Sequence, residues 1–118
     1  CAMKVRSVIA YKNYFFDFLS YQRPKVKEKI YWTIKVFEEL KVIPVEYLKH
    51  IEGTNGLYEM RIQLGSDAFR IFCFFDNGNC VILGNGFQKK TQRTPLQEIE
   101  RDLQIKKEYE TRFEDENN

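Results

Sequence analysis

The chain has 118 residues, 43% of them hydrophobic and 15% aromatic, which is enough for one domain with a modest core, and we expect no second domain. Its net charge is only +2, because residues 108–118 carry five acidic groups against one arginine, whereas residues 1–107 carry 18 basic and 12 acidic groups. A basic domain with an acidic end suits a protein that meets phosphate on one surface.

The sequence also bears on compartment and on metal binding. No apolar run approaches the roughly 18 to 20 residues that cross a bilayer, and the N-terminus lacks the apolar core of a signal peptide, so we expect a cytoplasmic protein that contacts no membrane. Cys1 and Ala2, which precede Met3, are expected to be a cloning remnant. Cys73 and Cys80 are expected to be free thiols on the core face of adjacent strands, and one histidine beside them does not complete a metal site. We therefore expect no metal and no cofactor.

The first third of the chain is predicted to contain a strand and two helices. Residues 5–11 form a β-branched run that suits an opening strand. Residues 15–19 suggest a short helix that ends near Pro24, because the residue before a proline is pushed out of helical geometry. A longer amphipathic helix follows and is expected to end at Pro44. Its apolar positions are Val26, Ile30, Ile34, Phe37 and Leu40.

The segment before the central strands carries the one histidine of the chain. Between Glu46 and Asn55 we expect one helical turn and a loop, because glycines follow closely. His50 lies in this segment. It is either a surface residue or, since it precedes Glu59 by only a few positions, a member of a site.

The strongest functional signal is a pair of arginines in a predicted hairpin. The hairpin strands are residues 57–64 and 67–75, and Gly65 suits the first position of a two-residue type II′ turn. That register places Arg61 directly opposite Arg70. Like charges opposite each other in a sheet are unfavourable, so the pair makes most sense if an anion lies between the two side chains.

A second hairpin is predicted to extend the charged region. Residues 76–79 suit a type I′ turn, and the resulting register sets Cys73 opposite Ile82 and Arg70 opposite Asn85. Four polar side chains then gather at one end of one face: Glu59, Arg61, Arg70 and Asn85.

The segment directly beyond that end is dense in cations and hydroxyls. Residues 86–95 include Lys89, Lys90, Thr91 and Arg93. Together with the arginine pair they predict a site for phosphate groups. The alternative is that these are ordinary solvated charges on the open side of a sheet.

The last predicted element is a helix that begins with a capping box. Thr94 can accept from the amide of Gln97 while the Gln97 side chain reaches back, with Pro95 at the first helical position. The expected buried stripe is Leu96, Ile99 and Leu103. Residues 108–118 are expected to be an acidic, frayed tail, which leaves residues 3–107 as the folded domain.

Three motifs carry a resemblance to a known family. They are Gly56 to Ile62, then Phe69 to Phe72, then Gly86-Phe87 with Lys89 to Thr91, Thr94-Pro95 and Glu98-Ile99. In this order they resemble the HigB-like, phage-related branch of the RelE/ParE toxin superfamily. The resemblance implies a small toxin of a type II toxin–antitoxin system: a ribosome-dependent mRNA endonuclease neutralised by a cognate antitoxin, often a helix-turn-helix protein.

The element order β-α-α-β-β-β-α predicts an α+β fold, which agrees with the RelE-like fold that the resemblance implies. We expect an antiparallel sheet with the two N-terminal helices on one face and the C-terminal helix elsewhere. The other face would then carry an apolar patch formed by Leu57, Phe74, Val81 and Leu83. The last helix or an antitoxin segment must cover such a patch.

The site residues can be assigned to the steps of metal-independent RNA cleavage, in which the 2′-hydroxyl attacks the adjacent phosphate. Arg61 and Arg70 would stabilise the phosphorane charge. Lys89 or Lys90 would act as acid or base, because neighbouring cations lower an ammonium pKa. Glu59 is either the base or a salt-bridge partner that spaces the arginines.

Other residues are expected to bind phosphate or RNA without moving protons. These are Asn85, Thr91, Arg93 and His50. Thr91 would donate to phosphate or serve the turn. Some HigB-type nucleases have a histidine near the C-terminus that this chain lacks, which leaves the acid and base assignment open.

The predicted long helix has a second cationic group. Lys25, Lys27 and Lys29 are either the solvated face of an amphipathic helix or a contact with ribosomal RNA. Tyr31 and Trp32 are expected to be packing residues rather than platforms for base stacking.

Two other functions remain open from the sequence. One is a ParE-like inhibitor of DNA gyrase without chemistry of its own. The other is an inactive phage-derived relative whose cationic face only binds RNA or its antitoxin. The dense set of cations and hydroxyls after Phe87 favours the nuclease.

Overall fold

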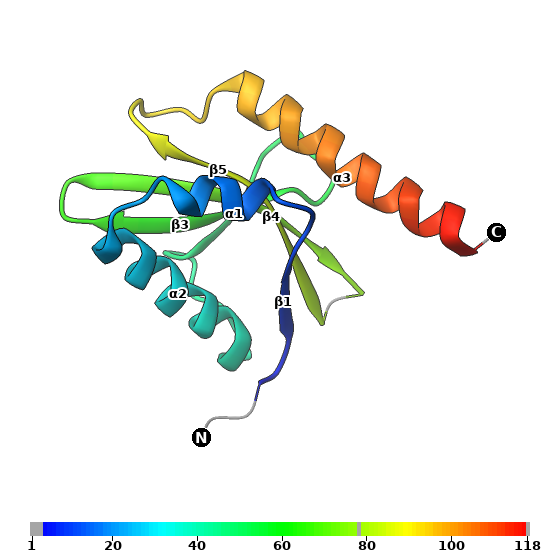
Figure 1. Cartoon of the computed structure of the whole chain (residues 1–118), viewed down its shortest axis with the longest axis horizontal. Coiled ribbons are helices and arrows are strands. Elements are labelled where there is room, and N and C mark those ends of the chain that lie inside the picture. The colour runs from blue at the N-terminus through cyan, green and yellow to red at the C-terminus, as the bar shows by residue number, and fades with distance from the viewer. Residues whose placement is uncertain (1–3, 78, 118) are drawn as a thin grey trace.

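A five-stranded sheet organises the residues that the computed structural model describes, which are 4–77 and 79–117 (Figure 1). The elements in chain order are β1 (Ser7–Ala10), α1 (Tyr14–Ser20), α2 (Pro24–Glu39), β2 (Leu48–His50), β3 (Tyr58–Leu64), β4 (Asp67–Asp76), β5 (Cys80–Lys89) and α3 (Leu96–Asn117). The strand order is β1-β5-β4-β3-β2, with β1 parallel to β5 and every other pair antiparallel. The α+β class is confirmed, and the arrangement is consistent with a RelE-like fold. Cys1 and Ala2 lie outside the described residues.

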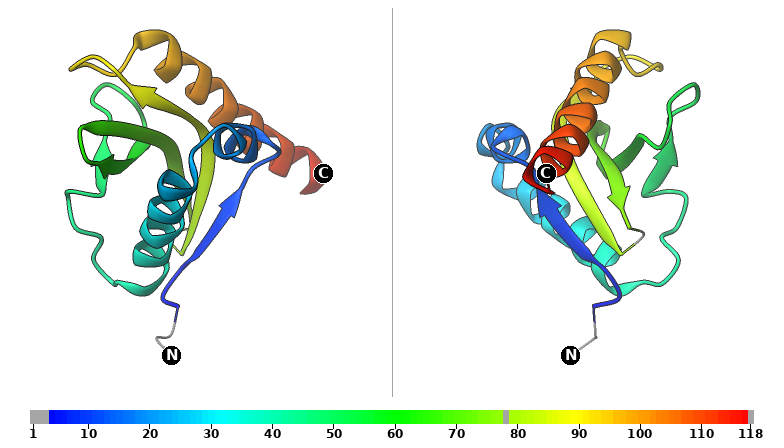
Figure 2. Two further views of the ribbon diagram at one scale, coloured as in Figure 1. Left: turned by 60° about the vertical axis from the view of Figure 1, so that its left-hand side comes forward. Right: turned by 90° about the vertical axis from the view of Figure 1, so that its right-hand side faces the viewer.

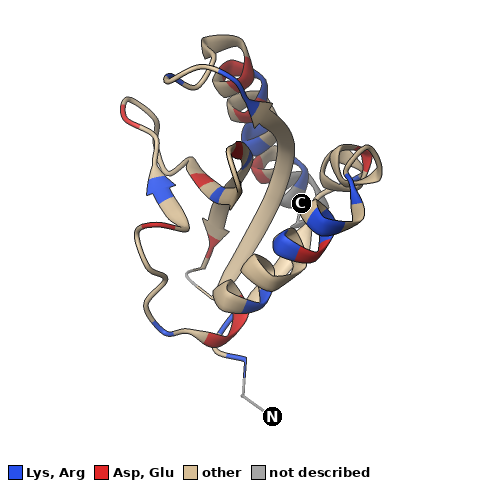
Figure 3. Cartoon of the chain, turned by 90° about the vertical axis from the view of Figure 1, so that its left-hand side faces the viewer, with Lys and Arg blue, Asp and Glu red and all other residues tan. Residues whose placement is uncertain are grey.

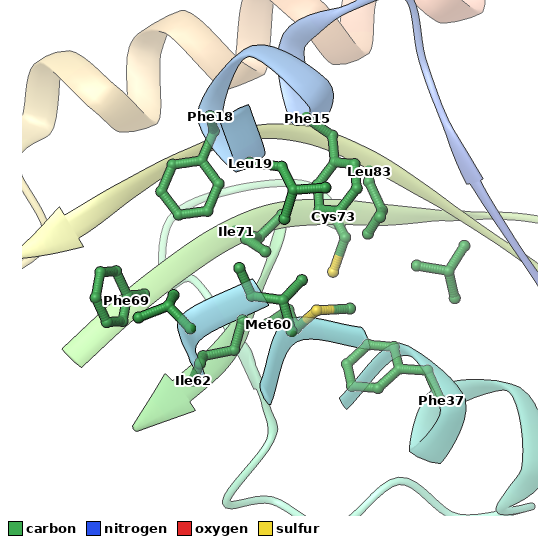
Figure 4. Packing of buried hydrophobic residues seen from close by; sticks show 13 residues of the cluster. Phe15, Phe18, Leu19, Phe37, Met60, Ile62, Phe69, Ile71, Cys73 and Leu83 are labelled. Atoms are coloured by element: carbon green, nitrogen blue, oxygen red, sulfur yellow. The ribbon is translucent and has the colours of Figure 1, made fainter. Parts of the chain in front are cut away.

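Two apolar layers lie on opposite faces of the sheet, because successive strand residues point to opposite sides. α1 and α2 cover one face, where Phe15, Ile30 and Phe37 pack against Met60 and Ile71 (Figures 2 and 4). α3 covers the other face, where Ile105 packs against Leu57 and Phe72. No helix in the described part of the chain is both long and apolar enough to span a bilayer.

The predicted register of the first hairpin is confirmed. Met60 pairs with Ile71, and Arg61 pairs with Arg70. Gly65 has a positive φ of +62°, which a type II′ turn requires at its first central position. Ser66, at the second central position, does not have a positive φ, which also agrees with this turn type. The local turn chemistry therefore fixes which face each side chain of β3 and β4 occupies.

The predicted register of the second hairpin is wrong. Asp76 pairs with Cys80, so the loop has three residues, and Asn77 takes a left-handed φ of +59°, while Gly78 lies outside the described residues. Cys73 faces Leu83 rather than Ile82. A β-bulge then follows, because Phe72 alone spans two residues of β5, and Arg70 consequently faces Phe87 rather than Asn85.

The bulge exists where α3 docks on the sheet. A Cβ atom at Gly84 would lie 2.6 Å from Oδ1 of Asp102, so only glycine allows this close approach. The same carboxylate oxygen accepts a hydrogen bond of 2.9 Å from the backbone N–H of Asn85. The bulge therefore supplies the donor, and Gly84 supplies the space, for a buried carboxyl group on α3.

The changed register moves side chains between faces. Cys73 and Cys80 are free thiols as predicted, but Cys80 is half-buried on the α3 face rather than beside Cys73. Val81 and Leu83 pack under α1 and α2, so they do not belong to the predicted patch. That patch is instead Leu57, Phe72, Phe74 and Ile82, and Ile105 of α3 covers it.

The segment before β3 contains a strand that the sequence did not predict. Instead of a helical turn, residues 48–50 form β2, which pairs with β3 and places Lys49 opposite Glu59. A strand of three residues is stable only through such pairing, so its own sequence carries little signal. The sheet therefore has one strand more than the predicted order.

Helix α2 ends at Glu39, five residues before Pro44, and the side chain of Arg6 donates to carbonyl groups at that end. The guanidinium donates to the carbonyl oxygens of Leu40 and Lys41, each at 2.6 Å, and to that of Phe37. Carbonyl groups at a helix C-terminus lack partners within the helix, and a cation also suits the dipole there. Leu40 is 45% exposed and lies outside the predicted buried stripe.

Replacing Arg6 by alanine should lower the free energy of unfolding by about 1 to 2 kcal/mol, because three carbonyl groups lose a charged donor. Urea denaturation of the purified chain measures the change. Lys4→Ala is the control, since the Lys4 side chain is 68% exposed and forms a surface ion pair with Glu38, and it should cost less than about 0.5 kcal/mol. An equal loss in both variants would contradict the capping role of Arg6.

Helix α3 differs from prediction at both ends. It begins at Leu96, which is 68% exposed, and the Thr94 hydroxyl donates to Glu59 at 3.0 Å instead of capping the helix. At the other end the helix continues through Asn117, past the expected boundary at 107. Tyr109 packs on the sheet and its hydroxyl donates to Asp76 at 2.7 Å. The acidic segment is therefore helical, and its first turn contacts the rest of the chain.

Candidate functional site

A polar cleft of about 460 Å³ opens on the face of the sheet that carries α3, at the end where β2, β3 and β5 meet the start of that helix. Its lining residues are Lys49, His50, Ile51, Glu52, Glu59, Arg61, Arg70, Lys89, Gln92, Arg93, Thr94 and Ile99. Five lysine and arginine side chains thus face two carboxylates. The surplus of positive charge makes this cleft suited to an anion.

The innermost part of the cleft is an ion pair between Arg70 and Glu59. The arginine Nε lies 3.2 Å from Oε2 of Glu59, and both side chains are more than nine-tenths buried. The Nε atom is close to the carboxylate without being aligned for a hydrogen bond, whereas Nη1 donates to the carbonyl of Phe69 at 2.9 Å. Thr94 donates to the other oxygen of Glu59. Glu59 is therefore held by two partners and anchors Arg70.

Arg61 completes the arginine pair from the neighbouring strand. It lies directly opposite Arg70 and is half-buried, and both side chains line the same cleft. Burial lowers the pKa of Arg70, and the charge of Arg61 lowers it further. Two guanidinium groups repel each other through their positive charges, so an anion that lies between them stabilises both.

Lys89 brings an ammonium group to the same cleft from the last residue of β5. Its pKa is lowered, first by burial and then by the charges of Arg70, Arg61 and Lys49, against the opposing effect of Glu59. The direction agrees with the sequence-based expectation. The sequence-based expectation named Lys90 as the second lysine that lowers this pKa, but Lys49 has this effect instead. Lys90 is exposed and does not line the cleft.

The structure separates the remaining predicted site residues into two groups. Arg93 and His50 line the cleft, and the His50 ring lies edge-on to Tyr58 with 5.1 Å between ring centroids. Thr91 does not line it, because its hydroxyl donates to the carbonyl of Arg93 within the turn.

Asn85 also lies away from the cleft. Its Nδ2 donates to Glu98 at 3.0 Å and its backbone N–H to Asp102, so both groups hold α3. The three-residue turn and the bulge each shift the register by one residue, so Arg70 faces Phe87 rather than Asn85. Asn85 therefore joins the helix to the sheet.

Sequence reasoning missed four polar lining residues, which are Lys49, Glu52, Gln92 and Thr94. Lys49 and Glu52 would have been found only if the short strand β2 had been recognised. Thr94 was assigned to helix capping. The sequence offered one signal for this strand: Lys49 and Glu59 have opposite charges, and they lie opposite each other when β2 pairs with β3.

The donor set fits an anion better than a metal ion. Within residues 4–77 and 79–117 no group of three or more histidine, cysteine, aspartate or glutamate side chains could hold a metal. An arginine fork matches the oxygens of a phosphate, and Lys89 adds a third cation beside the arginine pair. The cleft can therefore bind a phosphodiester and stabilise added negative charge on it.

Comparison with known proteins identifies the family of this chain. The family model described as "Phage derived protein Gp49-like" matches residues 17–107, which is well over half of the chain. This family stands in the context of toxin–antitoxin systems of the RelE and HigB kind. No curated protein matches the chain. The matched segment contains α2, the whole β2–β5 part of the sheet and the cleft, and the chain belongs to the family of phage-derived Gp49-like proteins.

Proposed function

We propose that the chain is the toxin of a type II toxin–antitoxin system and that it cuts mRNA on the ribosome. One observation carries the proposal: Arg61 and Arg70, from adjacent strands, line a single cationic cleft together with Lys89. Membership in the Gp49-like family supports the toxin–antitoxin context. The resemblance to HigB-like toxins supports RNA, rather than a small phosphate compound, as the substrate.

The proposed reaction needs no group from outside the chain and the RNA. The 2′-hydroxyl loses its proton and its oxygen bonds to the adjacent phosphorus, and the bond from phosphorus to the 5′-oxygen breaks. The leaving oxygen takes a proton, which gives a 2′,3′-cyclic phosphate and a free 5′-hydroxyl. Arg61 and Arg70 bind the phosphoryl oxygens and stabilise the extra negative charge of the transition state.

Lys89 is the proposed proton-transfer group. Proton transfer is most efficient when the pKa of the group lies near the working pH, and the pKa of Lys89 is shifted in that direction. Glu59 is better suited to hold Arg70 than to act as base, because both of its oxygens have partners. The proposed partners are the ribosome, mRNA and an antitoxin, all met in the cytoplasm.

Primer-extension mapping of transcripts after brief induction tests this function. We expect cuts in phase with codons within translated regions, because the proposed substrate is mRNA held by the ribosome. Intact transcripts together with damaged or unreplicated DNA would contradict this proposal and indicate a gyrase inhibitor. Normal growth with intact RNA and DNA would indicate an inactive relative.

A further inference from the structure

An exposed aromatic and cationic surface on α2 lies outside the cleft. Trp32 is 47% exposed and Tyr31 is 55% exposed, so the expectation that both are packing residues is wrong. The Trp32 indole is nevertheless held in place, because Tyr47 meets it edge-on at 5.5 Å between centroids. The ammonium of Lys29 lies 4.4 Å from the centre of the indole. The indole is thus both oriented and accessible.

Two hollows near this surface share lining residues with each other and with the cleft. The first, of about 300 Å³, lies at the edge of the sheet and is lined by Lys29, Glu46, Tyr47, Arg61, Ile62, Gln63 and Arg70. The second, of about 400 Å³, lies on α2 and is lined by Lys25, Glu28, Lys29, Trp32 and Leu64. Arg61 and Arg70 are shared by the cleft and the first hollow, and Lys29 is shared by the two hollows. The three spaces therefore adjoin one another.

The edge of β3 is open at this point because β2 is short. The pairing between the two strands ends at Leu48 and Met60, and the N–H of Arg61 donates to the carbonyl of Tyr47 beyond it, at 2.8 Å. The first hollow lies beside these two residues. A strand of nucleic acid that leaves the cleft can pass this edge to α2, where lysine positions follow one another along the helix (Figure 3).

We propose that the two hollows together, hereafter the Trp32 track, bind single-stranded RNA, with one base stacked on Trp32 and its phosphates against Lys29 and Lys25. The proposal rests on the proposed function, since the RNA would be the continuation of the strand whose reacting phosphate lies between Arg61 and Arg70. Four cations and two carboxylates line the track, which gives it the charge that a polyanion needs. An aromatic platform beside cations is the usual means of holding a single strand.

A base can compete with Lys29 for the indole. Stacking of a base on an exposed aromatic ring stabilises binding more than a cation over the same ring does. Lys29 is then released toward the phosphate next to that base. Binding at the track therefore gains one stacked base and one charge contact for the loss of one weaker contact.

The indole itself reports on binding, because Trp32 is the one tryptophan of the chain. The probe is a 2′-O-methyl RNA of about ten nucleotides, which binds single-strand sites but has no free 2′-hydroxyl to react. We expect saturable quenching of the tryptophan fluorescence that weakens as salt rises. The anisotropy of an end-labelled probe gives the dissociation constant for variants that lack the indole.

Trp32→Ala should weaken probe binding about 5- to 100-fold, and Trp32→Phe should restore most of it because a ring remains. Tyr31→Ala is the matched control: it removes an exposed aromatic ring from the same helix, next to Trp32 but outside both hollows. Lys29→Ala should also weaken binding, whereas Lys35→Ala should not. Circular dichroism confirms that each variant is folded.

The outcomes separate this inference from the proposed function. Equal affinities of Trp32→Ala and Tyr31→Ala would overturn the track, even if transcripts are still cut in phase with codons. Equal binding of polyglutamate and of the RNA probe would also overturn it, because the surface would then select an acidic peptide as readily as RNA. If RNA binding depends on Trp32 but transcripts stay intact in cells, RNA binding at the Trp32 track would be supported and the proposed nuclease activity would be contradicted.

Discussion

Arg61→Ala should reduce transcript cutting by at least about 100-fold and relieve growth inhibition, because removing one preorganised donor to a developing oxyanion has an effect of that size. Arg61 is the cleanest test of the arginine pair. Among the described residues it has no carboxylate within ion-pair distance, so its loss leaves no buried charge unpaired. Its position on β3 is fixed by pairing with Arg70, which alanine preserves.

Arg70→Ala would be a poorer test of the same idea. Its loss leaves Glu59 buried with Thr94 as the remaining hydrogen-bond donor, and breaking a buried ion pair from one side costs about 3 to 5 kcal/mol. Lost activity would then be confounded by unfolding. Arg61→Ala separates chemistry from stability, since its side chain is only half-buried.

The measurement is the fraction of a transcript cut after brief induction, together with growth of the same cells. Lys90→Ala is the matched control, because it removes an exposed cation next to Lys89 in sequence but outside the cleft, and it should leave cutting within about twofold of the parent since exposed charges are weakly coupled. Full toxicity of a folded Arg61→Ala protein would remove the phosphate-site proposal. An equal loss of cutting in Arg61→Ala and Lys90→Ala would mean that the effect depends on overall charge and not on a phosphate site.

The hairpin that carries the arginine pair could be predicted because its information is local. Gly65 selects the turn, the turn selects the register, and the register decides that Arg61 and Arg70 share a face. Phe69 and Ile71 alternate with Arg70 on β4, which gives a period-two signal typical of a strand.

The register of the next hairpin could not be predicted, because its loop has three residues instead of two and because a distant residue decides the bulge beyond it. The bulge at Gly84 and Asn85 accommodates the carboxyl group of Asp102, which lies 17 residues beyond the amide that it binds. Nothing in the turn at Asn77 reveals that contact. The same limit applies to β2, whose three residues are a strand only because β3 lies beside them.

The exposure of Trp32 could not be predicted either. The helical period separates a buried face from a solvated one, and it places the tryptophan near the boundary between them. Which side of the boundary is covered depends on Tyr47, in the segment that the sequence assigned to a helical turn. The cleft was thus partly predictable from β3 and β4, whereas its extension toward α2 required the fold.

Asp102→Asn should remove a large part of the pH dependence of stability. Asp102 is 1% exposed, its Oδ1 accepts from Asn85, and its Oδ2 has no hydrogen-bond partner. Burial raises the pKa of this carboxyl group to about 7; the N–H of Asn85 and the charge of Arg101 oppose the shift, and Glu98 adds to it. The folded chain therefore retains a proton that the unfolded chain has already lost at the same pH.

The sign of the effect follows from that difference in bound protons. Between the unfolded pKa of 3.8 and the folded pKa of about 7, the folded state binds more protons, so its stability falls as pH rises and levels off above the folded pKa. Between about pH 5 and about pH 8, this group should cost the parent about 2 to 3 kcal/mol, a cost that asparagine does not incur. The difference between parent and variant isolates Asp102 from all other titrating groups.

Urea denaturation at the two pH values measures this difference, and Glu100→Gln on the exposed side of the same helix is the control that should show none. The test concerns the slope rather than the absolute stability, because the side-chain amide in the Asp102→Asn variant would bring its own buried donor to the position of Oδ2. A parent and an Asp102→Asn variant with parallel pH profiles would mean that the carboxylate is ionised in the folded state throughout this range. The bulge at Gly84 would then stabilise a charge rather than accommodate a neutral acid.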